Sequence, residues 1–507
     1  MLRFGYGYGA SDQDEFIPLL LHKLDPTLFR QDWFVQTQLD AFSVRTYFSW
    51  LLHALSLVMP VPLAVFAVYA ASWIGIACGI YRLALALTGV PLAAALSIAL
   101  VLLATPFWTL GGNDLAHSML VPSMTSWAIG LIGLGWFVEG RHARAAGWMG
   151  VATWMQALVG LQLALLGGLI LLSLARRPGG VRRTGVFGMA YLLAAAPALG
   201  PLFYQQFTGD AATGVDLFYI MARFRNPHHY LFHSFSERSF VRFGLLASAG
   251  LAGWIVLRRT LDPDRWHLIV RALVIMLIVC GLAYVATEQL NALTVAKLQL
   301  FKLTVVAKLL FCVGIAGAGV HLLPAQVRQY ILRTLERLTW QSGLLGAVLV
   351  AVGCIYMIGR DDLTHKIYPF SLRTSPSAAM ETWARRETPV DAVFAVPPSL
   401  SSFRSGAQRA IVIDHKAFPY RDTDIGEWFT RLIDMAPIAL PERTDATLMR
   451  RLDEAYEGLS AQELAERIDR YGIAYIVRET PLPDAAGARL VHVSPPWHVY
   501  QFASTAP

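Results

Sequence analysis

Long apolar runs recur along this chain, and they limit its fold more than any other feature of the sequence. Two examples are LAAALSIALVLLATPFW at 92–108 and GLLGAVLVAVGCIYMIG at 343–359. A helix needs roughly 20 predominantly apolar residues to cross a bilayer. Only 15% of the residues are charged, against about 25% in soluble proteins. The sequence therefore predicts a polytopic α-helical membrane protein.

Arginines concentrate in short connections between the apolar runs, and basic residues mark the cytoplasmic loops of membrane proteins. This placement accounts for the net charge of +7, so we expect no nucleic-acid partner. The basic connections contain Arg82; Arg141 and Arg144; Arg176, Arg177, Arg182 and Arg183; Arg258, Arg259 and Arg265; and Arg328, Arg333 and Arg337. Alternation then assigns to the extracytoplasmic side residues 1–60, 107–118, 205–240, 287–298 and everything after 360.

One interval breaks this alternation. Residues 139–144 and 176–183 both read as cytoplasmic, yet only about 30 residues separate them, and two full spans need about 40. The sequence between them therefore predicts two short helices that run up and back, with a turn near Gly160. Irregular backbone at membrane depth is tolerated only inside protein or against a polar cavity. We therefore expect a cavity above Gln156 and Gln162.

Residues after Gly359 are more charged and richer in proline than those before them. The segments DAVFAVPP, RAIVIDHK and AYIVRE are typical of short strands. DIGEWFTRLI, DATLMRRLDEAY and AQELAERIDRYG are typical of amphipathic helices. We expect residues 361–507 to form a small extracytoplasmic α/β domain, tethered by the apolar run that precedes it.

Three carboxylates, Asp12, Asp14 and Glu15, lie just before the apolar body of the chain, and Asp32 follows. Exposed loops often carry acids without a special role. Neighbouring aromatic residues indicate instead that the segment folds onto the membrane surface. Carboxylates held there serve as a general base. Alternatively, Asp12 and Asp14 would supply oxygen ligands to a divalent cation such as Mg²⁺ or Mn²⁺.

The next outer connection contains GGNDLAHSML at 111–120. Asp114 and His117 are spaced i,i+3 and would share a face if the segment were helical. In the alternative, Asn113 or Asp114 caps a helix. Asp114 and His117, together with Asp32, are secondary site candidates.

The segment FYIMARFRNPHHYLFHSF at 218–235 interleaves basic and aromatic side chains on the predicted outer surface. Its basic members are Arg223, Arg225, His228, His229 and His233. Arginine forms bidentate contacts with phosphate, so the segment is a candidate for binding an anionic lipid headgroup. Two alternatives stay open: a metal site built from the three histidines, and interfacial anchoring by snorkelling arginines.

The stretch LNALTVAKLQLFKLTVVAKLLF at 290–311 places cations along an apolar helix. Charge inside a membrane is costly and usually functional. Lys297 is placed to mark the interface, whereas Lys302 lies deeper, so we expect Lys302 to contact a buried phosphate. A further basic stretch, SSFRSGAQR at 401–409, is either a contact for an anionic glycan or a solvated loop.

These features together resemble the GT-C superfamily of membrane glycosyltransferases. Those proteins combine an acidic first outer loop, many helices, a broken helix pair and a soluble outer C-terminal domain. GYGASDQDEFIP, LDPTLFRQDWF, FRNPHHY, LQLFK, ETWARRETPVDAVFAVPP and RAIVIDHKAFPY are similar to segments of a largely uncharacterised bacterial branch. We expect an acidic first loop with interfacial helices at 1–60, a GT-C-like transmembrane domain at 61–360, and a periplasmic α/β domain at 361–507.

The resemblance also implies a reaction. GT-C enzymes transfer a sugar from a polyprenyl-phosphate carrier at the outer membrane face, and an acid of the first loop is taken to be the general base. By position Asp12 matches that acid, with Asp14 and Glu15 as neighbours. The leaving lipid phosphate gains negative charge that cations would stabilise. The candidates for this contact are Arg223, Arg225, His228, His229 and Lys302.

The amino terminus departs from the family pattern. GT-C enzymes have a transmembrane helix before the acidic loop, whereas only MLRFGYGYGAS precedes Asp12. We expect the true start to lie upstream. In the alternative, the amino terminus is translocated without that helix, and such a form would be an inactive relative.

Three functions follow as hypotheses. The first is a glycosyltransferase of the bacterial cytoplasmic (inner) membrane. It would contact membrane lipids and transfer sugar from a polyprenyl-phosphate donor to a glycan, lipid or protein acceptor. The second is a non-catalytic GT-C-like scaffold or accessory protein in polysaccharide assembly. The third is a lipid transporter or flippase, but polar residues are concentrated on the predicted outer side instead of forming a path from both faces. We expect the glycosyltransferase.

Overall fold

The computed structural model describes residues 5–9, 11–105, 108–208, 214–336, 367–372, 376–482 and 488–502. The chain divides into two compact units. The helical unit comprises Met1–Tyr6, Ala67–Leu199 and His228–Ile367, and the mixed unit comprises Gly7–Phe66, Gly200–Pro227 and Tyr368–Pro507. Each unit therefore draws on segments that lie far apart in the sequence.

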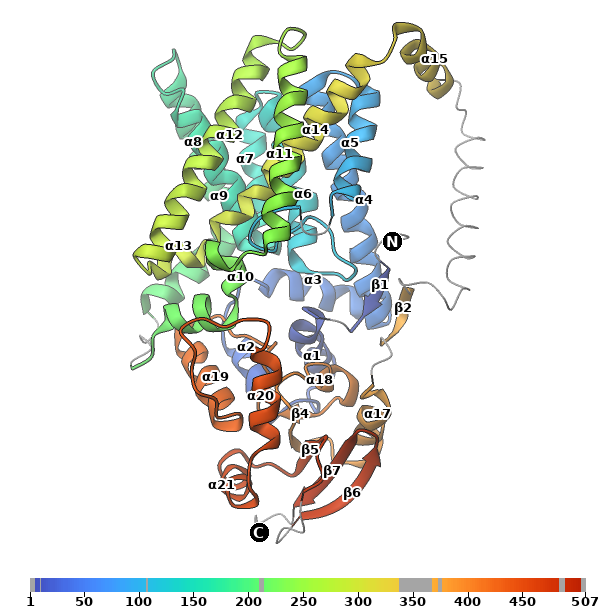
Figure 1. The fold of residues 1–507 in the computed structure, drawn as a ribbon, viewed down its shortest axis with the longest axis vertical. Coiled ribbons are helices and arrows are strands. Elements are labelled where there is room, and N and C mark those ends of the chain that lie inside the picture. The colour runs from blue at the N-terminus through green and yellow to red at the C-terminus, as the bar shows by residue number, and fades with distance from the viewer. Residues whose placement is uncertain are drawn as a thin grey trace. The chain divides into compact units, whose positions relative to one another are not determined.

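Long helices that pack against one another build the helical unit (Figure 1). Its described helices are α4 (Val61–Thr88), α5 (Pro91–Leu103), α6 (Pro122–Val138), α7 (His142–Met155), α8 (Ala157–Leu172), α9 (Gly180–Thr208), α10 (Pro227–Tyr230), α11 (Glu237–Leu257), α12 (Pro263–Tyr284), α13 (Leu293–Lys297), α14 (Thr304–Leu322) and α15 (Ala325–Glu336). The first residues of α4 and α10 and the last of α9 belong to the mixed unit. Short irregular helices lie between these elements, namely η2 (Phe232–Ser234), η3 (Val285–Gln289) and η4 (Leu300–Leu303).

Several described helices are able to span a membrane. Judged by length and composition, they are Val61–Thr88, Gly180–Gln206, Glu237–Leu257, Pro263–Gln289 and Leu293–Leu322. The predicted class, a mainly helical chain with several such helices, is confirmed. The apolar run at 343–359 lies outside the described residues. The GT-C fold, and the side of the membrane on which each loop lies, stay predictions.

The chain turns back between α7 and α8, as the short interval between the arginine groups predicts. Gln156 ends α7 and caps α8, where its side chain accepts a hydrogen bond from the backbone N–H of Val159 (2.9 Å). Gly160 lies against α7, because a Cβ there would lie 2.5 Å from the carbonyl oxygen of Met149. The turn is therefore at Gln156, slightly before the predicted position. The glycine allows the two helices to approach closely.

The span Leu293–Leu322 is broken near its start, between α13 and η4. Gln299 has a left-handed backbone conformation with φ of +46°. The side-chain amide of Gln162 donates hydrogen bonds to the carbonyl oxygens of Leu298 (2.6 Å) and Gln299 (3.1 Å). Backbone groups freed at membrane depth need such partners. Gln162 therefore supplies the hydrogen bonds that the carbonyl oxygens at the break accept. The sequence did not predict this role.

The mixed unit combines an N-terminal helical segment, a π-helix and a C-terminal α/β region. Its helices are α1 (Gln13–Leu24), α2 (Trp33–Asp40), α3 (Thr46–Ser56), η1 (Tyr219–Arg225), α17 (Ala378–Glu387), α18 (Phe403–Ala407), α19 (Asp422–Met435), α20 (Leu448–Glu457) and α21 (Ala461–Tyr471). Its main sheet contains β3 (Val393–Ala395), β4 (Ala410–Ile411), β5 (Tyr475–Arg478), β6 (Ala488–Ser494) and β7 (Trp497–Phe502). Two further strands, β1 (Tyr6–Tyr8) and β2 (Ile367–Leu372), pair with each other.

The five-stranded sheet has the order β4-β3-β5-β7-β6. Strand β3 pairs in parallel with β4 and β5, and β7 pairs antiparallel with β5 and β6. The predicted α/β character of this region is confirmed. The predicted strands correspond to β3, β4 and β5, and the predicted helices to α19, α20 and α21, whereas β6 and β7 were not predicted.

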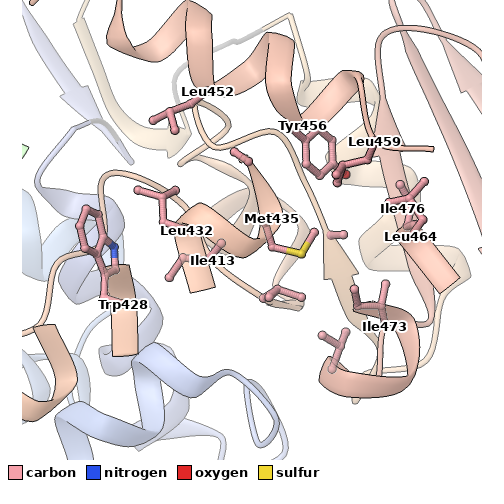
Figure 2. Close-up of a cluster of buried hydrophobic side chains, with 14 of the residues drawn as sticks. Ile413, Trp428, Leu432, Met435, Leu452, Tyr456, Leu459, Leu464, Ile473 and Ile476 are labelled. Carbon is pink, nitrogen blue, oxygen red and sulfur yellow. The ribbon is translucent and has the colours of Figure 1, made fainter. Parts of the chain in front are cut away.

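A large hydrophobic core of the mixed unit lies among α19, α20, α21 and the sheet (Figure 2). Figure 2 labels Ile413, Trp428, Leu432, Met435, Leu452, Tyr456, Leu459, Leu464, Ile473 and Ile476. Ile220 and Phe224 of η1 are buried in the same core. The backbone N–H of Thr444 also donates to the carbonyl oxygen of Arg223 (3.0 Å). Segment 218–225 is therefore built into the C-terminal region.

The domain limits predicted from the sequence, 1–60, 61–360 and 361–507, stay a prediction. The compact units group the chain differently, because the mixed unit contains Gly7–Phe66 and Tyr368–Pro507 together with Gly200–Pro227. The acidic first segment therefore shares a unit with the C-terminal region, and this arrangement positions the candidate site.

Candidate functional site

A tight backbone turn precedes the acidic segment. Gly9 and Ser11 have positive φ angles of +67° and +53°, and the second is uncommon for a residue with a side chain. The Gly9 N–H donates to the buried side chain of Gln13 (2.6 Å). Asp12 occupies the N-cap position of α1, but its side chain makes no capping hydrogen bond. The Asp12 carboxylate therefore makes its contacts elsewhere.

Asp12 faces a lysine of the C-terminal region. Lys416 Nζ lies 2.5 Å from Asp12 Oδ1 and 3.9 Å from Glu15 Oε1. The side chain of Asp12 is 37% exposed and that of Lys416 is 28% exposed. The carbonyl oxygen of Lys416 accepts a hydrogen bond from Arg225 Nη2 (2.9 Å). This ion pair is therefore partly open to solvent, and Arg225 holds the backbone of Lys416 in place.

Asp14 lies in a different environment. It is 3% exposed and accepts hydrogen bonds from the hydroxyls of Ser401 (3.0 Å) and Ser405 (3.3 Å). Burial raises the pKa of the Asp14 carboxyl well above its ordinary value. The serine hydrogen bonds and the charge of Lys416 oppose this change, and the charge of Asp414 adds to it. Asp14 is thus enclosed by hydroxyls in a setting that favours its neutral form.

Glu15 forms an ion pair with Arg45, which lies just before α3. The Arg45 guanidinium also lies 5.2 Å from the centre of the Tyr420 ring. Burial by itself would lower the pKa of Arg45, but the neighbouring charge of Glu15 raises it above its ordinary value. Glu15 therefore holds a permanently charged partner, although it also lies near Lys416.

Asp32 is fully buried and serves the fold. One carboxylate oxygen caps α2 by accepting from the Val35 N–H (3.0 Å). The other accepts from Arg404 Nε (2.8 Å) and from the Ile411 N–H (3.0 Å). Arg404 is 1% exposed and also pairs with Asp414. Burial by itself would lower the pKa of Arg404, but the two carboxylates raise it above its ordinary value.

The buried position of Arg404 corrects one expectation for residues 401–409. A solvated loop was one of the two predicted states of this stretch. Residues 403–407 instead form α18, which is buried throughout. Arg409 is also buried, where it donates to the carbonyl oxygens of Arg385 (2.8 Å) and Thr388. Both arginines hold the mixed unit together, so neither is presented to a glycan.

Arg223 and Arg225 lie on η1 in the mixed unit. Arg223 Nη1 lies 3.6 Å from Glu442 Oε1, and its side chain is 27% exposed. Arg225 donates to Asn226 Oδ1 (2.8 Å) as well as to the Lys416 carbonyl. Arg225 is therefore used largely for local structure, and the Arg223 side chain is partly exposed.

The remaining candidates for a phosphate contact lie in the helical unit. His228 and His229 are on α10, with ring centroids 4.1 Å apart. His229 Nδ1 lies 2.7 Å from the carbonyl oxygen of Gly111. Lys302 is on η4 and partly buried. The five predicted phosphate contacts are thus divided between the two units, and their joint role stays a prediction.

The connection that contains Asp114 and His117 is not helical, because it consists of turns and bends and α6 begins only at Pro122. The proposed shared helix face and the proposed helix cap are therefore both wrong. Lys308 Nζ donates to Asp114 Oδ1 (2.6 Å) and to Thr105 Oγ1 (2.8 Å), and Lys308 is fully buried. His117 is partly exposed, and its carbonyl oxygen accepts from the Tyr69 hydroxyl (2.9 Å). Asp114 therefore anchors the connection to α14.

The described residues contain no group of three or more His, Cys, Asp and Glu side chains that could hold a metal ion. Asp12 faces the ammonium of Lys416, and Asp14 is enclosed by serine hydroxyls. These surroundings do not fit a Mg²⁺ or Mn²⁺ site shared by the two carboxylates, because an ammonium competes with the cation for the same oxygen.

Sequence reasoning found the acids of this site but missed their partners. Arg45, Ser401, Ser405, Asp414 and Lys416 were not predicted as site residues. Lys416 lies in RAIVIDHKAFPY, which carried part of the family resemblance. The available signal was the position of Asp414 and Lys416 directly after a short apolar strand, since the loops that follow such elements often carry functional side chains.

Comparison with known proteins identifies one segment. Residues 376–435 match the model of a family described as "Domain of unknown function (DUF6798)". No curated protein matches the chain. The matched segment contains Ser401, Arg404, Ser405, Asp414 and Lys416, all of which contact the acidic segment or hold residues that do. The match therefore covers the C-terminal side of the candidate site without assigning an activity to it.

Proposed function

We propose that this chain is a membrane glycosyltransferase of the GT-C type. It transfers a sugar from a polyprenyl-phosphate-linked donor to a glycan, lipid or protein acceptor at the outer face of the bacterial cytoplasmic membrane, where the C-terminal region also lies. The helices long and apolar enough to span a membrane support this proposal. A lipid-linked donor is reached by a protein that is itself embedded in the bilayer.

The difference between Asp12 and its acidic neighbours carries the proposal. Asp14, Glu15 and Asp32 are buried and bound to partners of the mixed unit. Among these four acids, Asp12 alone combines partial exposure with a facing cation. A general base must be ionised and within reach of the proton that it accepts. We propose Asp12 as this base, because its carboxylate is partly exposed and faces an ammonium.

In the proposed reaction, Asp12 accepts the proton of an acceptor hydroxyl. The acceptor oxygen forms a bond to the anomeric carbon of the sugar, and the bond from that carbon to the lipid phosphate breaks. The phosphate leaves with the electron pair. A sugar hydroxyl is a far weaker acid than a carboxylic acid, so the proton moves in the transition state. The left-handed backbone at Ser11 supports the assignment, because strained residues concentrate at functional sites.

Cations would stabilise the charge that develops on the leaving phosphate. Of the predicted contacts, Arg223 and Arg225 belong to the same unit as Asp12, and the Arg223 side chain is partly exposed. No step is assigned to a divalent cation, because the surroundings of Asp12 and Asp14 do not fit one.

The proposal is tested by sugar transfer with the full chain in liposomes and a panel of polyprenyl-phosphate sugars. Asp12→Asn preserves the size of the side chain but removes the base, so we expect at least about a hundredfold loss of transfer. Asp25→Asn is the matched control, because Asp25 is an exposed acid of the same segment and should be replaceable without loss. Equal transfer by the wild type and Asp12→Asn would remove Asp12 from the mechanism.

A non-catalytic scaffold in polysaccharide assembly is the second candidate function. The enclosure of Asp14, Glu15 and Asp32 in structural contacts favours it. In a cell that lacks the gene and is deficient in polysaccharide, a scaffold carrying Asp12→Asn would restore the product. The glycosyltransferase predicts that this variant fails while it is still inserted at wild-type levels.

A further inference from the structure

We infer that Lys416 is a positioning residue of the proposed active site, which holds Asp12 ionised and oriented toward the acceptor; this inference rests on the proposed function. The direct observation is the 2.5 Å contact between Lys416 Nζ and Asp12 Oδ1. Both side chains are partly exposed, so a substrate hydroxyl is able to approach the same carboxylate. A charged hydrogen bond of this kind favours the ionised acid.

The backbone that carries Lys416 is fixed by buried contacts. Arg225 donates to its carbonyl oxygen (2.9 Å), and the next residue, Ala417, donates its N–H to Asp414 Oδ1 (2.6 Å). Asp414 is itself paired with buried Arg404. The ammonium is therefore presented from a rigid support, and rigid support is what a positioning residue requires.

Other charged groups lie around this contact. Arg45, before α3, interacts with Glu15, Tyr420 and Asp12, and Asp14 interacts with Asp414 and Lys416. Arg45 is committed to Glu15 by an ion pair. Asp14 is enclosed by hydroxyls and shielded from water. Lys416 forms a direct ion pair with Asp12.

The arrangement also suits the proton transfer. When Asp12 accepts the proton of the acceptor hydroxyl, its charge is lost and the ammonium of Lys416 loses its closest anion. Glu15 Oε1, at 3.9 Å, remains beside that ammonium. Lys416 therefore keeps an opposite charge nearby before and after the transfer. The proton transfer therefore does not leave the Lys416 ammonium without a neighbouring carboxylate.

The pH dependence of kcat/KM for the full chain in liposomes tests the inference. Lys416→Met removes the facing cation, so the acid limb of the profile should move to higher pH by about one to two units. Lys416→Arg retains a cation and should restore most of the wild-type limb. Arg450→Gln is the matched control, because Arg450 forms an exposed pair with Glu454 on α20 and should leave the profile unchanged.

Infrared difference spectra give a second readout that needs no turnover. The band of the protonated Asp12 carboxyl is identified by its loss in Asp12→Asn, and its titration midpoint should rise in Lys416→Met and in Lys416→Gln. An unchanged midpoint in both variants would overturn the inference, because it would mean that the charge of Lys416 does not influence the ionisation of Asp12. If the wild type transfers no sugar, the proposed function fails, and the infrared midpoint still decides whether Lys416 holds Asp12 ionised.

Discussion

Asp12 and Asp14 are separated by one residue on the same turn of chain, yet their surroundings are opposite. Asp12 lies at the exposed edge of the site and faces an ammonium, whereas Asp14 points into the unit and meets hydroxyls. A cation stabilises a carboxylate, and burial stabilises the neutral acid. Two acids of one turn are thereby placed in different environments, and the proposed function assigns proton transfer to Asp12 alone.

The surroundings of Asp14 predict an unusual dependence of stability on pH. Burial raises the pKa of folded Asp14 well above its ordinary value of 3.8. Between these two pKa values the folded state binds more protons than the unfolded state, so the free energy of unfolding falls as pH rises through that window. Asp14→Asn is neutral throughout and retains an acceptor for a serine. Its thermal unfolding midpoint should match the wild type at low pH and exceed it at neutral pH.

Thermal unfolding of the full chain in detergent, followed from acidic to neutral pH, checks this expectation. Asp25→Asn is the control, because Asp25 is exposed and its pKa is lowered by hydrogen bonds from Thr27. That variant should keep the wild-type decline. If the midpoints of wild type and Asp14→Asn run parallel at every pH, Asp14 is not the group responsible.

At the scale of single elements, sequence patterns succeeded where one face of an element is buried and failed where the backbone is irregular. The helices α19, α20 and α21 were predictable because their apolar residues recur on one face, which packs into the core. Strand β6 is an edge strand with mostly exposed or half-buried side chains, so it lacks the alternation that marks a strand. Lys302 was preferred over Lys297 on the assumption of a continuous helix, and the left-handed Gln299 interrupts that helix.

The close approach of α7 and α8 gives a prediction at this scale. In Gly160→Ala the new Cβ would lie 2.5 Å from the Met149 carbonyl oxygen and would also meet Thr153, so the two helices must separate. Overpacking of this kind costs about 1–3 kcal/mol. Gly147→Ala is the matched control on α7, because nothing lies within 4 Å of a Cβ at that position. Alanine there should stabilise the helix by up to about 1 kcal/mol.

The thermal unfolding midpoint of each variant, in the same detergent, measures the difference. A lower midpoint for Gly160→Ala and an equal or higher midpoint for Gly147→Ala are expected. A Gly160→Ala midpoint that matches the control would mean that the two helices are not packed as closely as their backbones indicate.

At the scale of the whole molecule, the sequence revealed the class of protein but not which segments fold together. Apolar runs are local signals, and they predicted the helices able to span a membrane. The contacts of Asp14 with Ser401 and of Asp32 with Arg404 join residues almost 400 positions apart. No local pattern encodes such a pairing, because either partner alone resembles an ordinary surface residue. The acids of the candidate site were therefore predictable. The residues that give each acid a different environment, such as Lys416 and Ser401, were not.

The composition of the mixed unit predicts that its C-terminal part does not fold alone. The core of residues 368–507 includes Ile220 and Phe224 from η1, and buried Arg404 requires Asp32. Removal of buried Ile or Phe side chains costs about 2–5 kcal/mol each, and folded domains have only about 5–15 kcal/mol in total. A fragment of residues 368–507 should therefore show no cooperative unfolding in denaturant. The full chain is the control, and a sharp transition in the fragment would contradict this prediction.

The assembly of the mixed unit from Gly7–Phe66, Gly200–Pro227 and Tyr368–Pro507 has a consequence for biosynthesis. The ribosome makes the acidic segment several hundred residues before Ser401 and Arg404. During nearly the whole of translation, the residues around Asp14 and Asp32 have no serine hydroxyls and no Arg404 to receive them. The mixed unit therefore cannot complete its fold until the C-terminal residues that contact Asp14 and Asp32 have been made.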